Sequence, residues 1–145
     1  MSVRQRNNVK VFGKGSQPML FAHGYGCDQH MWRFITPAFE NDHTIVVFDH
    51  VGHGHSDASR YDRSKYSTLD GYAEDVLEIC HELDLTDVIF VGHSVSAMIG
   101  ILAAIVPGAE RSASTPTIAL TECPTNMAGP CPNSAMISFT SSAYP

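Results

Sequence analysis

The chain has 145 residues, of which 43% are apolar and 17% charged, and its formal net charge at pH 7 is −6. This length suits one domain, and this apolar content is sufficient for a packed core. The negative charge argues against nucleic acid or an anionic membrane as a partner. The sequence has no apolar run of about 18 residues that could span a membrane. It also has no apolar stretch behind its first basic residues that would mark a secretory signal, so we expect a cytoplasmic protein.

The first half of the chain alternates strand patterns with helix patterns. Residues 9–12 predict a short strand, and residues 19–22 predict an apolar strand that ends at a glycine loop. Residues 28–39 carry apolar side chains at helical spacing, and Asp28 is the predicted N-cap of this helix. Residues 45–48 predict the next strand, which a loop of glycines and histidines follows.

The pattern continues with a helix, a strand and a second helix. The first helix is predicted to start at Ser67, whose spacing from Asp70 is typical of a capping box. Residues 88–91 predict the last clear strand, and residues 95–106 predict an almost wholly apolar helix. The strands at 45–48 and 88–91 are continuous apolar runs, which is typical of a parallel sheet buried on both faces. The predicted fold class is therefore α/β.

The composition of the chain changes near residue 107. All nine Lys and Arg residues lie before residue 112, and residues 112–145 carry one charged side chain, that of Glu122. This segment is rich in Ser, Thr, Pro and Ala and has neither helical nor strand periodicity. We therefore predict a partial α/β core over residues 1–106 and an irregular tail over residues 107–145. The two explanations for this tail are a shift of the reading frame and genuine divergence from related chains.

Two sets of residues are candidates for a metal or redox site. The loop after the third predicted strand contains His50, His53 and His55, but its glycines and the lack of a carboxylate or thiol at helical spacing argue against a metal. The cysteines form no Cys-x-x-Cys pair, so we expect reduced thiols and neither a zinc site nor a disulfide scaffold. They are Cys27, Cys80, Cys123 and Cys131. We expect no metal and no organic cofactor.

The motif Gly92-His93-Ser94-Val95-Ser96 lies directly between a predicted strand and the apolar helix. So tight a strand-to-helix turn strains its central residue and exposes that side chain, as in the elbow that presents a nucleophilic serine. The simpler alternative is that Ser94 only caps the helix. The general elbow pattern ends in glycine, and Ser96 takes that place here. We expect His93, which points away from Ser94, to be a buried structural histidine.

A second motif, His23-Gly24-Tyr25-Gly26, follows the predicted strand at residues 19–22. Its glycines allow backbone N–H groups to turn inward, toward the site where a loop in this position stabilises an oxyanion. A plain turn is the alternative for this loop alone. The two motifs together predict acyl-transfer chemistry, with the N–H groups of Tyr25 and Val95 as the oxyanion donors.

Several segments of the chain resemble the RsbQ-like family of α/β-hydrolases, which acts in bacterial sigma-B stress signalling and is related to plant karrikin and strigolactone receptors. The segments are residues 8–11, 22–29, 48–49, 51–57 and 91–100. The resemblance implies the N-terminal part of an α/β-hydrolase sheet, an apolar pocket and a Ser-His-Asp triad acting on a small hydrophobic compound. It further implies that Ser94 is the nucleophile, that Tyr25 and Val95 form the oxyanion hole, and that a serine at position 96 is familiar in the group.

The family places its catalytic Asp and His after the nucleophile. In this sequence no histidine follows His93 and no aspartate follows Asp87, and the family's lid and later strands are missing too. A serine without an adjacent base is a poor nucleophile. We therefore expect a serine hydrolase of small hydrophobic ester-like compounds that is truncated here and weakly active or inactive. The alternatives are a non-catalytic module that senses such a ligand and signals to a regulatory protein partner, and a product without independent function.

Overall fold

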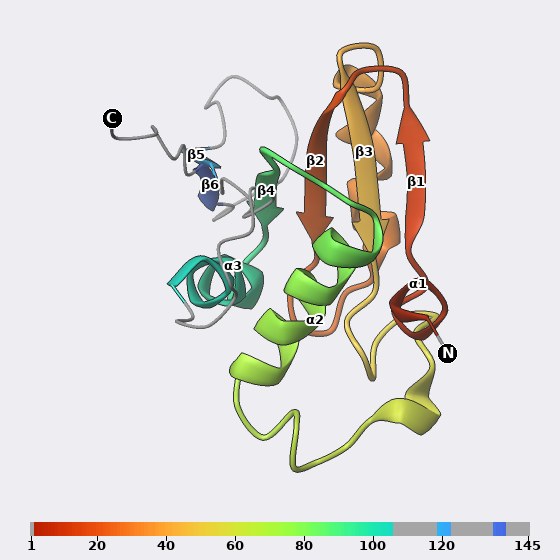
Figure 1. Ribbon diagram of the computed structural model, residues 1–145, viewed down its shortest axis with the longest axis vertical. Helices are drawn as coiled ribbons and strands as arrows, with labels where there is room; N and C mark the ends of the chain where they lie inside the picture. The colour runs from red at the N-terminus through yellow and green to blue at the C-terminus, as the bar shows by residue number, and fades with distance from the viewer. Residues whose placement is uncertain (1, 106–118, 123–134, 139–145) are drawn as a thin grey trace.

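The protein is described by a computed structural model over residues 2–105, 119–122 and 135–138. Its centre is a four-stranded sheet in the order β1-β3-β2-β4 (Figure 1). The strands are β1 (Lys10–Gly13), β2 (Gln17–Ala22), β3 (His43–Phe48) and β4 (Ile89–Gly92). β2 is parallel to both β3 and β4, whereas β1 is antiparallel to β3 at the edge. The predicted α/β class is confirmed.

Alternate residues of the parallel strands pack into two separate hydrophobic clusters, one on each face of the sheet. Leu20, Val46 and Phe90 point to the face that α1 (Val3–Arg6), α2 (Asp70–Glu82) and α3 (Val95–Ile105) cover. Phe21, Ile45 and Val91 point to the opposite face, where Trp32 packs against them. Both faces are therefore buried, which is why these strands are continuous apolar runs in the sequence.

The order of the strands explains why helices lie on both faces. From β2 the chain crosses to β3 on one side, and from β3 it returns past β2 to β4 on the other side. Crossovers between parallel strands are right-handed, so connections that run in opposite directions along the sheet lie on opposite faces. Figure 1 shows α2, the second connection, crossing in front of the sheet.

The helix predicted over residues 28–39 is instead two short 3₁₀ helices, η1 (Gln29–Phe34) and η2 (Thr36–Ala38). The predicted cap is confirmed, because the Asp28 side chain accepts a hydrogen bond of 2.8 Å from the N–H of His30. Pro37 accounts for the difference, since proline lacks an N–H and disfavours helical geometry in the residue before it. A third 3₁₀ helix, η3, spans Ala58–Arg60.

The predicted capping box at Ser67 is wrong. α2 has Leu69 as its N-cap residue, without a side-chain hydrogen bond to the helix. The Ser67 hydroxyl instead donates to the carbonyl oxygen of Ser64, and the Thr68 hydroxyl donates to the carboxylate of Asp70. Short polar side chains often satisfy a local turn rather than a helix end, and the preceding loop decides the outcome here.

Two further strands lie in the segment that was expected to be irregular. β5 (Ala119–Glu122) pairs antiparallel with β6 (Ala135–Ser138), and β6 lies beside β4. Pairing satisfies backbone groups that single extended segments would leave to water. The rest of the predicted tail, and with it Cys123 and Cys131, lies outside the described residues. Cys27 and Cys80 are free thiols, and burial raises the pKa of Cys80 to about 12. Within the described residues, no helix has the length and apolar character needed to cross a membrane.

The backbones of β4 and α3 come into close contact at Gly92. A Cβ atom on this residue would lie 2.7 Å from the backbone carbonyl atoms of Ser96 and 2.8 Å from the nitrogen of Ala97. We predict that Gly92→Ala lowers the free energy of unfolding by about 2 kcal/mol, since backbone has to move to admit the methyl group. Chemical denaturation measures the change, with Met98→Ala on the exposed side of α3 as the control. Equal stability of the two variants would contradict this packing argument.

Candidate active site

Ser94 occupies the junction between β4 and α3 in a strained backbone conformation. Its φ is 56°, in the left-handed region that residues other than glycine rarely adopt. A helix N-cap residue normally has extended backbone angles, so this geometry favours the elbow over a simple cap. The Ser94 side chain is exposed. Strain of this kind persists where the surrounding structure enforces it, and it is concentrated at functional sites.

The loop that contains Tyr25 lies at the same edge of the sheet as Ser94. Ala22 at the end of β2 pairs with Gly92 at the end of β4, and the N–H of His93 donates to the carbonyl of Ala22 at 3.0 Å. Tyr25 is 85% exposed, and its ring meets the ring of His53 edge to face, with centroids 5.6 Å apart. The structure thus brings the two predicted motifs together, although 68 positions separate Tyr25 from His93 in the sequence.

His93 is half-buried rather than buried, which corrects the expectation from the sequence. Its ring lies against Gly24, where an added Cβ would sit 2.4 Å from His93 Nδ1. The side chain therefore fills the contact between the two loops instead of entering the core. A side chain at position 24 would therefore have to displace the His93 ring.

Ser96 is completely buried, and its hydroxyl joins the elbow to both neighbouring loops. Ser96 Oγ lies 2.5 Å from the carbonyl oxygen of His23 and 2.7 Å from His50 Nε2. The N–H of His50 in turn donates to His23 Nε2 at 3.0 Å, and His23 Nδ1 lies 2.8 Å from the carbonyl oxygen of Gly24. No local pattern in the sequence links residues 23, 50 and 96, so this network could not be predicted from the sequence.

The two buried histidines of this network are held in their neutral form. Burial, together with the nearby rings of His23 and His53, lowers the pKa of His50 to about 3. Burial also lowers the pKa of His23. Among the described residues, no group of three His, Cys, Asp or Glu side chains is arranged to hold a metal ion. His50 and His23 are engaged with protein groups instead.

The carboxylate of Asp49, at the carboxyl end of β3, is fully buried and accepts four hydrogen bonds. The donors are Asn8 Nδ2 at 2.8 Å, the backbone and side-chain nitrogens of Gln29 at 2.8 and 3.1 Å, and the N–H of His55 at 2.9 Å. Burial alone would raise the pKa of Asp49, but these hydrogen bonds outweigh it and lower the pKa below its ordinary value. Asp49 therefore stays ionised and holds three segments of the chain together: the residues before β1, the start of η1 and the loop after β3.

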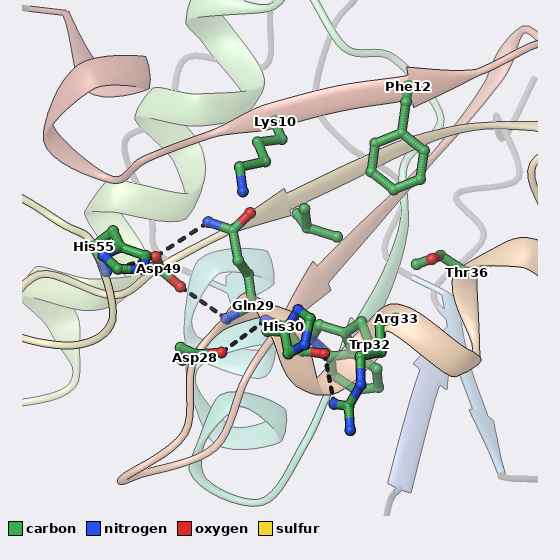
Figure 2. Close-up of a pocket in the computed structure, with 11 residues that line it drawn as sticks. Lys10, Phe12, Asp28, Gln29, His30, Trp32, Arg33, Thr36, Asp49 and His55 are labelled. Atoms are coloured by element: carbon green, nitrogen blue, oxygen red, sulfur yellow. Dashed lines mark hydrogen bonds between the residues drawn. The ribbon is translucent and has the colours of Figure 1, made fainter.

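A cavity of about 390 Å³ lies beside Asp49, on the face of the sheet that η1 covers (Figure 2). Lys10, Phe12 and Trp32 contribute to its wall, and the hydrogen bonds between Gln29 and Asp49 run along one side of it. Neither Ser94 nor Tyr25 lines this cavity. It is therefore separate from the candidate active site at the ends of β2 and β4.

Comparisons with known proteins agree with this geometry. Residues 17–111 match the family described as alpha/beta hydrolase fold. Over 103 residues the chain is 45% identical to the karrikin insensitive 2 receptor CA of Petunia hybrida, a match that covers 71% of this chain and 38% of the receptor. It is 43% identical over 98 residues to the strigolactone esterase D14 of Arabidopsis thaliana, covering 68% of this chain and 37% of that protein.

Among solved structures, a hydrolase from Oleispira antarctica superposes with a TM-score of 0.73 at 43% identity. That match covers 81% of this chain and 41% of the hydrolase. The chain thus spans about two fifths of the length of the relatives that it matches.

We predict that Asp49→Asn lowers the free energy of unfolding by about 3 kcal/mol, because the amide NH₂ would face N–H donors in a buried site. The difference between wild type and variant should be largest above pH 3.8, the ordinary pKa of aspartate, and shrink as the pH falls below it. Urea denaturation at several pH values measures this. The control is Asp42→Asn at an exposed position, which should leave the midpoint unchanged. A midpoint of Asp49→Asn equal to that of the control would refute the role of Asp49.

The lowered pKa of His50 leads us to predict a second pH dependence of the free energy of unfolding. Its pKa is lower in the folded chain than the ordinary 6.5, so its neutral form stabilises the fold fully above pH 6.5 and progressively less down to about pH 3. Over this window the free energy of unfolding of the wild type should fall more steeply than that of His50→Gln, by up to about 1.4 kcal/mol per pH unit. His23, His53 and Asp49 face His50 in both proteins, so the difference isolates His50. Parallel pH profiles would count against a buried neutral His50.

Proposed function

We propose that this chain, which belongs to the α/β-hydrolase fold family, carries the nucleophile and oxyanion hole of a serine hydrolase that acts on a small hydrophobic ester. The observation that carries this proposal is the left-handed φ of Ser94 at the tight junction of β4 and α3. In the proposed reaction, Ser94 Oγ attacks the carbonyl carbon of the ester. The N–H groups of Tyr25 and Val95 stabilise the negative charge that develops on the carbonyl oxygen.

The two buried histidines that are linked to Ser96 and its loop do not provide a base for Ser94. Both ring nitrogens of His23 have hydrogen-bond partners, and His50 Nε2 is engaged with Ser96. A base with a pKa of about 3 is poorly matched to proton abstraction near neutral pH. The family's Asp and His lie downstream of the nucleophile, where this sequence contains neither residue. We therefore propose that residues 1–145 alone hold an unactivated nucleophile.

A second proposed function is ligand sensing. The relatives include one protein named as a receptor and another named as an esterase, at similar identity and over matches of similar length. The same elbow and loop would serve a sensor that binds a small hydrophobic compound and signals to a regulatory protein partner. We also propose that the chain belongs to the RsbQ-like branch and has a role in stress signalling, either as a hydrolase or as a sensor.

We expect the purified chain to show little or no turnover of a p-nitrophenyl ester, because it lacks the family's base and acid. A serine protease that has lost a triad residue keeps a residual acceleration on the order of 10³–10⁴ over water from the oxyanion hole and binding, which is the upper limit for this chain. A fluorophosphonate should nevertheless label Ser94 slowly, which peptide mass spectrometry detects.

Ser94→Ala is the control for both measurements. Fast turnover that this variant loses would show that the chain supplies its own base. Labelling of a different residue, with Ser94 unmodified, would reject Ser94 as the nucleophile.

A further inference from the structure

We infer that Ser96 and His50 are positioning residues that hold the N–H of Tyr25 in the oxyanion hole. The inference rests on the proposed function of Ser94. It concerns a closed cycle of hydrogen bonds that links the start of α3, the loop after β2 and the loop after β3. The members of the cycle are Ser96, His50 and His23, and none of them is expected to touch the substrate.

The direction of each hydrogen bond follows from the chemistry of the partners. The carbonyl oxygen of His23 can only accept, so the Ser96 hydroxyl donates its single proton there. Ser96 Oγ must then accept from His50, which places the proton of His50 on Nε2. The backbone N–H of His50 donates to His23 Nε2, so the proton of His23 is on Nδ1. Each tautomer is thereby fixed by its neighbours.

The last bond of this network acts on the oxyanion donor itself. His23 Nδ1–H donates to the carbonyl oxygen of Gly24 at 2.8 Å, and the N–H of Cys27 donates to the same oxygen at 3.1 Å. The Gly24 carbonyl and the Tyr25 N–H belong to one planar trans peptide and point in opposite directions. Holding the Gly24 oxygen therefore sets the direction in which the Tyr25 N–H points.

Burial makes this arrangement rigid. His23 and Ser96 are 0% exposed and His50 is 3% exposed, so water does not compete for these hydrogen bonds. A glycine at position 96, as in the general elbow pattern, would have no hydroxyl and could not hold the His23 carbonyl. Ser96 therefore gives the oxyanion loop an anchor that the general pattern lacks.

Phenylboronic acid is a suitable probe, because it tests the oxyanion hole without requiring turnover. A bond forms between Ser94 Oγ and boron, the hydroxyl proton leaves to solvent, and the boron becomes tetrahedral and negatively charged without losing a group. Boron NMR on the full chain gives the dissociation constant. Nitrogen–proton NMR spectra report whether the amides of Tyr25 and Val95 respond to the adduct.

We expect the wild type to form the adduct and Ser94→Ala to form none. Ser96→Ala and His50→Phe should each raise the dissociation constant by roughly tenfold or more. This change is larger than the loss of one neutral hydrogen bond would cause and smaller than the loss of an oxyanion donor would cause. His50→Gln, whose amide can still donate to Ser96, should stay within about threefold of wild type. In the weakened variants the Tyr25 amide should lose its response, while the Val95 amide, which belongs to α3, keeps it.

The outcomes separate this inference from the proposed function. Absence of a tetrahedral adduct in the wild type would overturn the role of Ser94 and the inference with it. A wild-type adduct together with unchanged affinity in the folded Ser96→Ala and His50→Phe variants would overturn the inference alone, and would leave the network a purely structural role. If Ser96→Ala does not fold, the comparison of His50→Phe with His50→Gln decides.

Discussion

The buried negative charge of Asp49 is the constraint on which the site-bearing edge of the sheet depends. A carboxylate removed from water is costly unless hydrogen bonds replace its hydration, and here four N–H donors do so. These donors come from the segment before β1, from η1 and from the loop after β3. The Asp49 carboxylate therefore holds together three segments that are not linked by any local sequence pattern. Gly54, with a φ of 54°, lies so close to the Asp49 carboxylate that a Cβ would stand 2.5 Å from its Cγ.

The topology turns this local order into a site. β2 lies between β3 and β4. The chain runs from β2 to β3 on one side of it, and then passes back to β4 on the other side. In open α/β sheets such a switch point separates the loops at the carboxyl ends of adjacent strands and creates a place for a ligand. The Tyr25 loop follows β2 and the Ser94 elbow follows β4, so they meet at this point. The cavity beside Asp49 lies on a face of the sheet and has no part in that arrangement.

The histidines near the elbow show how burial decides their chemistry. Three imidazole rings come close together: the ring centroid of His23 lies 4.7 Å from that of His50 and 5.5 Å from that of His53. Three neighbouring histidines that are exposed to solvent could take part in proton transfer or bind a metal ion. Here the His23 ring donates from Nδ1 and accepts at Nε2, the His50 ring donates from Nε2 to Ser96, and desolvation keeps both rings neutral. They are suited to fix backbone geometry rather than to exchange protons with a substrate.

Local sequence determined the features that depend on neighbouring residues. The strands and helices of the α/β pattern, the Asp28 cap and the strained position of Ser94 each follow from a short stretch of chain, so periodicity and motif were sufficient to predict them. Where two local signals competed, at Pro37 and at Ser67, prediction from the sequence was wrong. The oxyanion roles of Tyr25 and Val95 stay predictions.

Only the tertiary structure decided the strand order, the antiparallel edge strand, the Asp49 hydrogen bonds and the link between His50 and Ser96. The partners of Asp49 and Ser96 lie 6 to 73 positions away along the chain, and no periodicity records such pairs. A buried polar group takes whichever partner the fold brings within about 3 Å, and that partner is set by the packing of the strands and helices rather than by the local sequence.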